Sequence, residues 1–479
     1  MELSVGLVRA LIPKFPLILK TTVSHSLSLS DTASQWDLGT ALTVSVLRSF
    51  VANYQRGTVT REQTITTRDP GVKGPMWVSK VTLPAPEDSN ILEILFKAIH
   101  GLCDGRETFT RPELSAVEAE WVGHRPGVDA NTLDPDLSPE EKYNHLMDEV
   151  KSDLTVLYIH GEYGSLLDPA SHRGTTHELA KMTKGRCFVI RYRLAPTYPF
   201  PAGLLDALIA YLSLLYPPPG SIHAAVTASK ICFSGDSAGG GMSLAIIQVI
   251  LELRRQSHDG HARVHWCGEE RELPLPAGAA INSGWFDLTR SMESIQTNAR
   301  YDYLPAYREP PSSHYTPDLI WPTSPPRCNF YANDDALLHP LISPVTARDW
   351  RGAPPLWFVA GEECLFDEIA FVAQQLVNQD IPLVFEYYRA MPHCFALVLP
   401  GRPSTRKCFY NWTNFLTAAI TDPGSIKTNA VEITAKTLEE TPLDPRTLSP
   451  RTIGEVRTRM KAAMDNVLEG HGEWLTSKL

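Results

Sequence analysis

The stretch Lys230-Ile231-Cys232-Phe233-Ser234-Gly235-Asp236-Ser237-Ala238-Gly239 decides the fold class of this chain. Its first half is mostly apolar and predicts a buried strand, and the apolar run from Gly240 to Leu253 predicts a helix. Between them, a G-x-S-x-G pattern centred on Ser237 predicts a sharp turn from strand to helix. Glycines suit such a turn, because it strains the backbone and brings neighbouring strands too close for side chains. The alternative interpretation is an ordinary glycine-rich turn.

Short apolar runs alternate with amphipathic helices over the residues around this stretch. The runs are Leu154–His160, Cys187–Tyr192, Ile231–Ser234, Ala279–Ser283, Leu356–Ala360 and Leu383–Tyr388. Because they are rich in Val, Ile and aromatic residues and are separated by helices, they indicate a parallel sheet buried on both faces. The sequence therefore predicts an α/β fold with a mostly parallel central sheet flanked by helices.

The rest of the chain suggests three regions. Residues 1–150 show mainly helical patterns, with one β-like run near Trp77 to Leu83, and are expected to form an N-terminal helical cap or lid. Residues 151–421 form the predicted catalytic domain. Within it, the proline-rich residues 288–345 show almost no periodicity and predict an insertion over the active site at the carboxyl edge of the sheet. Residues 422–479 are a polar C-terminal extension.

Composition and charge exclude several classes of protein. Of the 479 residues, 43% are hydrophobic and 20% are charged, which is typical of a globular protein. The 54 acidic and 44 basic residues give a net charge of −10, which disfavours a nucleic-acid partner. The eight cysteines form no CxxC pair, so neither a zinc site nor a disulfide framework is expected.

The N-terminal residues 1–23 are apolar, but three basic residues and two prolines interrupt them. They fall short of the roughly 18 uninterrupted apolar residues that a membrane span needs, and they lack the pattern of a secretory signal. A cytoplasmic location is therefore expected. An amphipathic segment that contacts either a membrane surface or the protein's own pocket stays open.

Ser237 needs a base and an acid if it is to act as a nucleophile, because a hydroxyl is a poor nucleophile at neutral pH. The best-placed base is His393, on a loop directly after an apolar strand. The segment Ala360–Glu368 offers four carboxylates at the end of the preceding strand. The order serine, acid, histidine is typical of an α/β-hydrolase, but loop position alone does not choose among the four acids.

Five motifs together resemble the hormone-sensitive-lipase-like esterases of the α/β-hydrolase fold. They are Tyr158-Ile159-His160-Gly161, Tyr192-Arg193-Leu194-Ala195-Pro196 with Phe200-Pro201-Ala202, Gly235-Asp236-Ser237-Ala238-Gly239-Gly240, Trp285-Phe286-Asp287-Leu288 and Met391-Pro392-His393. The resemblance covers about residues 150 to 420, and the flanking sequence is similar to fungal members. It implies a serine carboxylic-ester hydrolase.

The resemblance also implies which carboxylate is the acid. The family carries its acid in a D-P-L-x-D-E type motif thirty residues before the histidine, and Glu363 stands thirty residues before His393. Glutamate replaces the usual aspartate there. Asp367 is the fallback acid, with a helix cap or a first-turn charge as its structural interpretation.

A second departure lies in the expected oxyanion hole, where the family carries H-G-G-G or H-G-G-A. The resemblance implies that backbone amides among Gly161, Glu162 and Tyr163 join that of Ala238 in stabilising the tetrahedral oxyanion. The side chain of His160 is expected to anchor this loop. A carboxylate at Glu162 is expected to crowd the hole or to oppose the developing negative charge.

These residues together predict an esterase or lipase-like enzyme that cleaves a small apolar acyl or aryl ester through a Ser-His-Glu triad and an acyl-enzyme. No metal or organic cofactor is implied. Two alternatives stay open: a noncatalytic ligand-binding receptor on the same fold, which the residue at Glu162 favours, and an amide or lactone hydrolase. The sequence defines no oligomeric state.

Overall fold

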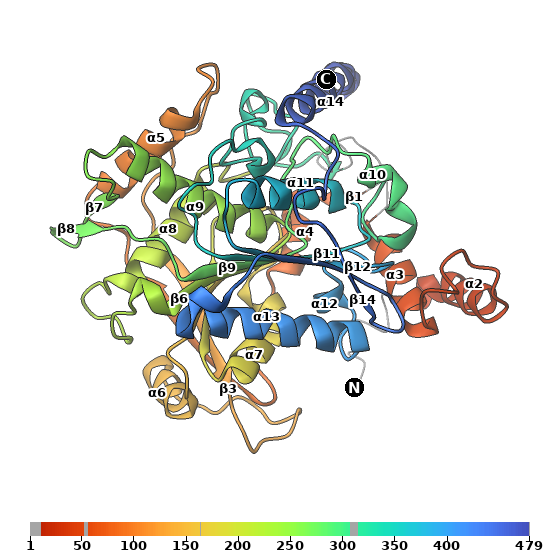
Figure 1. The fold of residues 1–479 in the computed structure, drawn as a ribbon, viewed down its shortest axis with the longest axis horizontal. Helices are drawn as coiled ribbons and strands as arrows, with labels where there is room; N and C mark the ends of the chain where they lie inside the picture. The colour runs from red at the N-terminus through yellow and green to blue at the C-terminus, as the bar shows by residue number, and fades with distance from the viewer. Residues whose placement is uncertain (1–10, 52–55, 163, 307–314, 479) are drawn as a thin grey trace.

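A computed structural model describes residues 11–51, 56–162, 164–306 and 315–478. These residues contain a ten-stranded sheet with the strand order β14-β13-β12-β11-β9-β6-β4-β5-β3-β2 (Figure 1). The strands are β2 (Met76–Leu83), β3 (Val117–His124), β4 (Thr155–Ile159), β5 (Arg186–Arg191), β6 (Ile231–Asp236), β9 (Gly278–Asn282), β11 (Leu356–Gly361), β12 (Leu383–Tyr388), β13 (Asn429–Ile433) and β14 (Glu440–Pro442). From β5 to β13 every neighbouring pair is parallel, whereas β2, β3 and β14 pair antiparallel at the two edges. The predicted α/β fold is confirmed.

Helices cover both faces of the sheet, as parallel strands require. The covering helices are α5 (Asn90–Leu102), α6 (Pro139–Glu149), α8 (Ala202–Leu215), α9 (Ala238–Gln256) and α11 (Phe366–Val377) on one face, and α7 (Pro169–Thr183) and α13 (Pro403–Thr421) on the other (Figure 1). Adjacent residues of a strand enter opposite layers of the core: Leu157 of β4 packs in one apolar cluster and Tyr158 in the other. This double burial explains the continuous apolar runs of the central strands.

The predicted boundary at residue 150 does not separate a cap from the sheet. β2 and β3 precede that residue, β2 pairs with β3 and β3 pairs with β5, so they extend the same sheet. β13 and β14 likewise come from the expected C-terminal extension. The sequence pattern missed this because residues 1–150 hold no run of parallel strands, and their helices dominate the periodicity.

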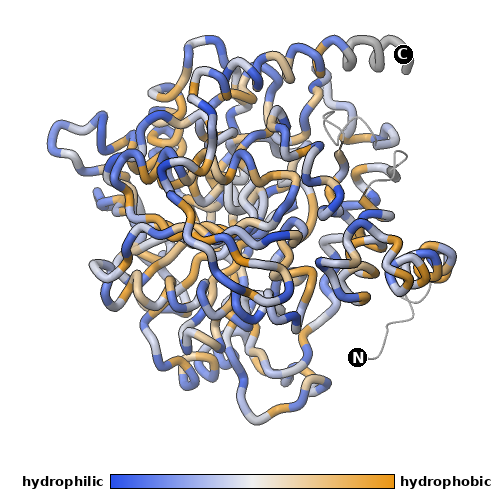
Figure 2. The backbone as a smooth tube through the Cα atoms, turned by 45° about the vertical axis from the view of Figure 1, so that its right-hand side comes forward, coloured by the Kyte–Doolittle hydropathy of each residue, from blue (hydrophilic) through white to orange (hydrophobic). Residues whose placement is uncertain are grey.

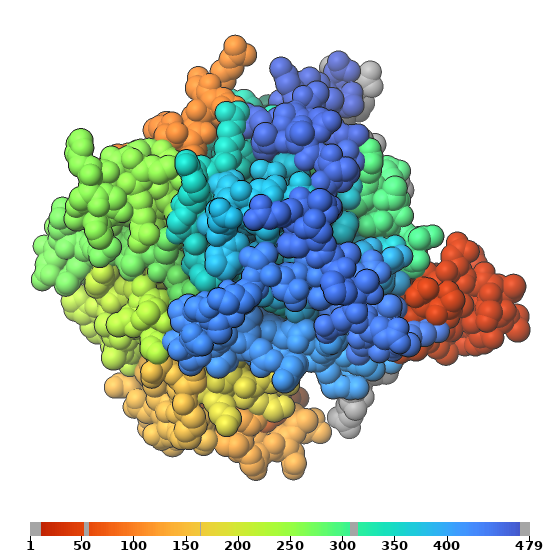
Figure 3. Space-filling model, viewed as in Figure 1, coloured from red at the N-terminus to blue at the C-terminus, as the bar shows by residue number. Residues whose placement is uncertain are grey.

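The described residues N-terminal to β2 lie outside the ten-stranded sheet. They include η1 (Ile12–Lys14), α2 (Phe15–Ser26), α3 (Leu38–Val51), β1 (Arg56–Thr58) and α4 (Val59–Thr66). Helices α2 and α3 project from the body as a separate lobe, which the space-filling view shows in red (Figure 3). We call residues 11–51 the N-terminal arm.

Most of the insertion is irregular, as its proline content predicts. Its described elements are α10 (Ser294–Thr297), η3 (Ala299–Tyr301), β10 (Tyr315–Thr316), η5 (Asp334–Ala336) and η6 (Pro344–Thr346). The remaining elements are η2 (Ala228–Lys230), β7 (Arg263–Trp266), β8 (Glu269–Glu272), α12 (Phe395–Val398), η7 (Pro423–Ser425) and α14 (Ile453–Lys478). In the described ranges, no helix combines the length and the apolar character needed to cross a bilayer.

Candidate active site

Ser237 lies in the turn between β6 and α9. Its backbone has a φ of 51° and a ψ of −123°, in a region that residues other than glycine rarely adopt. The turn is held by its own main chain, because the Ser237 amide donates to the Asn282 carbonyl at 3.0 Å and the Trp285 amide donates to the Ser237 carbonyl at 2.9 Å. The strained strand-turn-helix unit expected from the sequence is confirmed.

The two glycines of the motif are required because neighbouring main chain leaves no room for a side chain at either position. A Cβ atom on Gly235 would lie 2.6 Å from the Ile159 carbonyl oxygen, and one on Gly239 would lie 2.5 Å from the His160 carbonyl oxygen. Both distances are shorter than any van der Waals contact. The close approach of β4 to the turn therefore excludes any side chain at either position, as expected.

His393 and Glu363 meet at the carboxyl edge of the sheet. The His393 Nδ1 lies 2.7 Å from the Glu363 Oε1, and both side chains are buried. Glu363 follows β11 and His393 follows β12, as Ser237 follows β6, so all three occupy the same edge. Among the hydrogen bonds of the described residues, none joins the Ser237 hydroxyl to His393; the Nε2 of His393 lies 3.4 Å from the Cys394 Sγ.

The second carboxylate oxygen of Glu363 is also saturated. It accepts hydrogen bonds from the Ser283 hydroxyl at 2.6 Å and from the Gly361 amide at 2.9 Å. The same Ser283 oxygen accepts a hydrogen bond from the Cys394 amide at 2.9 Å. Ser283 thus connects the acid to the residue after His393. Sequence reasoning missed this role, although Ser283 ends an expected strand at the catalytic edge.

Asp302 of the insertion holds the acid loop and the histidine loop together. Its carboxylate is fully buried and accepts hydrogen bonds from the amide of Cys364 at 2.7 Å and from the amide of His393 at 3.2 Å. Because Cys364 directly follows Glu363, one side chain fixes the backbone beside both residues of the pair. No motif marks Asp302 in the sequence.

The pKa of His393 reports the same pairing. Burial by itself would lower the pKa of this imidazole, but its contacts with Cys394 and Glu363 raise the pKa well above the ordinary value. Burial raises the pKa of the Cys394 thiol to about 12, so the thiol is neutral near pH 7. The negative partner of the imidazole is therefore the Glu363 carboxylate, which stabilises the protonated ring.

The loop after β4 lies against the turn that carries Ser237. A Cβ atom on Gly161 would come within 2.9 Å of the Ser237 Cβ, so the main chain at Gly161 directly contacts the serine residue. Ala238 is the first residue of α9, where a free backbone amide and the helix dipole favour negative charge. Tyr163 lies outside the described residues.

Glu162 has a left-handed backbone with a φ of 75°, and its carbonyl accepts hydrogen bonds from the Ser165 and Leu166 amides. Burial is the main reason that the pKa of Tyr303 is raised well above its ordinary value, and the negative charge of Glu162 contributes. The ring of Tyr303 lies 6.0 Å from the ring of His393. The charge of Glu162 therefore acts on Tyr303, whose ring faces His393.

A buried polar network surrounds Asp236, the residue directly before Ser237. Asp236 accepts a hydrogen bond from the Tyr158 hydroxyl at 2.7 Å and lies 3.2 Å from the His172 Nε2. His160 stacks on Tyr192 with ring centroids 4.3 Å apart, and burial together with His172 lowers the pKa of His160 to about 3. His160 is therefore a neutral anchor of its loop, in agreement with the sequence interpretation.

The fallback acid, Asp367, takes part in a different contact. It lies in the first turn of α11, where its carboxylate accepts a hydrogen bond from the Ser294 amide of α10 at 3.0 Å. The next residue, Glu368, accepts hydrogen bonds from the Phe286 and Asp287 amides. Both side chains thus fasten neighbouring loops, and of the two candidate acids only Glu363 contacts His393 in the described structure.

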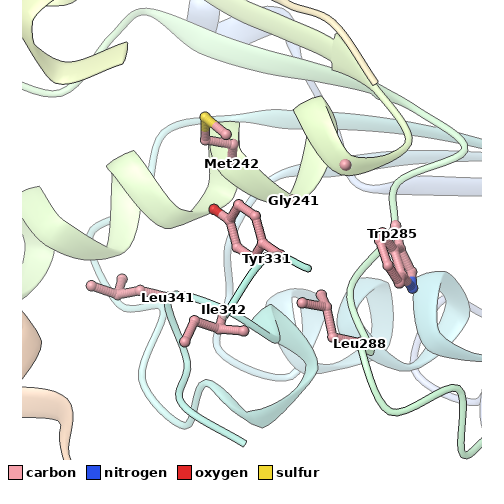
Figure 4. A pocket seen from close by; sticks show the side chains of 8 residues that line it. Gly241, Met242, Trp285, Leu288, Tyr331, Leu341 and Ile342 are labelled. Atoms are coloured by element: carbon pink, nitrogen blue, oxygen red, sulfur yellow. The ribbon is translucent and has the colours of Figure 1, made fainter. Parts of the chain in front are cut away.

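A small apolar pocket of about 20 Å³ opens beside Ala238, between α9 and the insertion (Figure 4). Its lining residues are Ala238, Gly241, Met242, Trp285, Leu288, Tyr331, Leu341 and Ile342. A volume of this size holds about one water molecule. The pocket fits a group no larger than a methyl unless its walls move.

Residues 156–397 match the family described as alpha/beta hydrolase fold, and the chain belongs to that family. It is 30% identical to an acetyl-hydrolase of Streptomyces hygroscopicus over 256 residues, which are 53% of this chain and 72% of the relative. It is 25% identical to an esterase of Acinetobacter venetianus over 266 residues, which are 55% of this chain and 74% of that relative.

Solved structures agree on the fold. A crystal structure of an esterase from the bacterial hormone-sensitive lipase family superposes with a TM-score of 0.52 at 21% identity, covering 80% of this chain and 99% of the other. At this identity the likeness shows the shared fold alone.

Proposed function

We propose that the chain is a serine carboxylic-ester hydrolase in which Ser237 is the nucleophile, His393 the general base and Glu363 the residue that orients the base. The observation that carries the proposal is the buried 2.7 Å contact between His393 and Glu363 at the sheet edge that also carries the strained Ser237 turn. Ester hydrolysis is also the activity in the names of the relatives from Streptomyces and Acinetobacter.

The reaction runs through an acyl-enzyme. The Ser237 oxygen attacks the ester carbonyl while the Nε2 of His393 takes the hydroxyl proton, which requires Nε2 to face Ser237 instead of the Cys394 thiol. The oxyanion is stabilised by the Ala238 amide and by amides of the loop that begins at Gly161. His393 then protonates the leaving alcohol. A water molecule, deprotonated by His393, cleaves the acyl-enzyme and restores the serine.

The small pocket supports a short acyl group as the substrate's acid part. The pocket adjoins Ala238, the residue after Ser237, whose amide belongs to the proposed oxyanion hole, and we therefore assign it to the group bonded to the reacting carbonyl carbon. A volume of about 20 Å³ favours acetyl over longer chains. The N-terminal arm and the insertion form the proposed cap over this edge. Membership among the fungal-type hormone-sensitive-lipase-like esterases stays a prediction.

Labelling with a fluorophosphonate probe tests the proposal. Wild type is expected to be labelled at Ser237, to hydrolyse p-nitrophenyl acetate, and to lose both properties in Ser237→Ala. Labelling of the variant at the wild-type level would refute the nucleophile assignment. Because the same triad could also cleave amides or lactones, such substrates are tested in parallel. Faster turnover of an amide or a lactone than of esters would favour the amide or lactone hydrolase that the sequence left open.

A noncatalytic binding role is the second candidate, and one observation favours it. The negative charge of Glu162 contributes to the raised pKa of Tyr303, whose ring lies 6.0 Å from that of His393, and a carboxylate in this region would oppose an oxyanion. A wild type without esterase activity that gains activity in Glu162→Gly would support the binding role.

A further inference from the structure

Helix α2 presents its apolar side to solvent. Ile12, Phe15, Leu19 and Val23 are exposed to 66%, 64%, 54% and 49%. Their spacing of three and four residues places them on one face of the helix and the turn before it. No residue of α2 is buried. The tube in Figure 2 shows this apolar colour on the projecting lobe.

The packing of α2 on α3 and the contacts of Lys14, in η1 directly before α2, hold the helix in this orientation. Helix α2 packs against α3, and the Lys14 ammonium donates to the Ser49 carbonyl at 3.1 Å and lies 4.9 Å from the ring of Phe50. A helix of a soluble domain normally turns its apolar side toward the core. The half-buried side of α2 carries Leu17 and Ile18 beside Thr21 and Thr22, so the helix is apolar on both sides, and the exposed apolar face is available to a partner.

The N-terminal arm is fixed to the catalytic edge. The indole of Trp36 donates to the Ala390 carbonyl at 2.5 Å, three residues before His393. Arg48 of α3 donates to the Asp302 carbonyl at 2.9 Å, and the carboxylate of Asp302 binds the His393 amide. A surface that binds α2 would therefore hold the catalytic edge nearby.

The charge of the segment differs from that of the whole chain. Residues 11–30 contain Lys14 and Lys20 and no Asp or Glu, whereas the chain has a net charge of −10. A second copy of the chain would bring two cationic apolar faces together, which charge disfavours. An anionic lipid surface complements both properties, because such a surface takes up apolar side chains and attracts lysines.

We propose that the apolar face of α2 docks on an anionic lipid surface, with Phe15, Leu19 and Val23 inserted and Lys20 at the headgroups. This docking goes beyond the hydrolysis itself and presents the catalytic edge to esters held at that surface. It requires no movement of the fold, since the face is already exposed.

Sedimentation with vesicles tests the docking. Wild type is expected to sediment with vesicles that contain phosphatidylglycerol, and to sediment less with pure phosphatidylcholine or at high salt. Phe15→Glu with Leu19→Glu should weaken binding at least tenfold, and Lys20→Glu about fivefold. The matched control is Leu133→Glu, because Leu133 is 68% exposed but lies in the loop before α6. It should bind like wild type.

Turnover of soluble p-nitrophenyl acetate and the thermal midpoint show whether each variant is folded, and the milder Leu19→Ser serves if the double variant unfolds. Wild type that ignores anionic vesicles would overturn the proposal. An equal loss of vesicle binding in Leu133→Glu would also overturn it. So would a wild type that is a dimer without lipid and that becomes a monomer in Phe15→Glu with Leu19→Glu. Ser237→Ala should bind vesicles normally, so the docking test is independent of the nucleophile assignment.

Discussion

Replacing Glu363 by glutamine tests the proposed role of the acid with a minimal change of shape. In the structure one oxygen of Glu363 faces the His393 Nδ1 at 2.7 Å, and the other accepts hydrogen bonds from the Ser283 hydroxyl and the Gly361 amide. Glutamine has one oxygen and one amino group. Because the Gly361 amide can only donate, the oxygen is expected to stay there and the amino group to face Nδ1. Nδ1 must then accept, which puts the proton on Nε2 and blocks transfer from Ser237.

The magnitude follows from the lost tautomer and the lost charge. Enforcing the wrong tautomer in a comparable triad costs about 10⁴ in kcat, or about 5.5 kcal/mol of transition-state free energy. A unit charge about 4 Å from the imidazolium, at an effective dielectric of about 20, accounts for about 4 kcal/mol. We therefore expect Glu363→Gln to lower kcat by about 10³ to 10⁴, with little change in KM.

The pH profile of kcat/KM gives an independent measurement. His393 must be neutral to accept the serine proton, and Glu363 raises its pKa above the ordinary value of about 6.5. Activity of wild type should therefore fall below a midpoint that is higher than about 6.5. In Glu363→Gln the carboxylate no longer favours the imidazolium, so the midpoint of the residual activity should move to lower pH.

Asp367→Asn is the matched control, because this carboxylate accepts one backbone hydrogen bond and does not contact His393 in the described structure. It should reduce the free energy of unfolding by about 1 kcal/mol and leave kcat within a few fold. The reasoning is refuted if Glu363→Gln keeps its kcat within tenfold of wild type, or if Asp367→Asn loses more activity than Glu363→Gln.

Three further substitutions probe the surroundings of the pair. Asp302→Ala leaves the buried amides of Cys364 and His393 without an acceptor. The free energy of unfolding should fall by about 1–3 kcal/mol per amide, which a lower thermal midpoint would show. In the same variant kcat should fall by a larger factor than KM rises. Unchanged kcat in the folded variant would contradict a positioning role. Glu162→Gly should raise kcat by up to about 10². A charge about 5 Å from the oxyanion, at an effective dielectric of about 20, destabilises the oxyanion by about 3 kcal/mol. An unchanged kcat would show that the carboxylate does not oppose the oxyanion. Leu288→Ala enlarges the apolar pocket and should shift the ratio of kcat/KM for butyrate over acetate esters upward by about tenfold, and an unchanged ratio would remove this pocket from the acyl site.

The nucleophilic turn could be predicted from the sequence because its constraints are local. The strand, the turn and the helix are consecutive, and the two glycines stand two residues from Ser237. The structure shows the steric reason at each glycine, where a β4 carbonyl or the carbonyl that follows it occupies the space of a Cβ. The choice of Glu363 among four carboxylates rested on the family resemblance, since nothing in the local pattern distinguishes it from Asp367.

The edges of the sheet could not be predicted in the same way. β2 and β3 pair antiparallel across 33 intervening residues that include a complete helix, so no short-range pattern connects them. The β-like run near Trp77 to Leu83 was expected and corresponds to β2, but nothing in its half-exposed pattern showed that it joins the central sheet through β3. The predicted cap, residues 1–150, therefore included two strands that belong to the central sheet.

The groups that hold His393 show why the site itself needed the structure. Its side chain contacts Glu363, 30 residues away, and its amide contacts Asp302, 91 residues away. The next amide, of Cys394, contacts Ser283 across 111 residues. These contacts come from β11, from the insertion and from the end of β9, and each saturates a buried polar group that would otherwise cost free energy. Because Arg48 of the N-terminal arm binds the backbone of Asp302, the insertion and the arm both take part in holding the base. A change in either segment is thus expected to alter the orientation of His393 before it alters the turn at Ser237, which is held by β4, by β6 and α9 and by the chain after β9, and by neither segment.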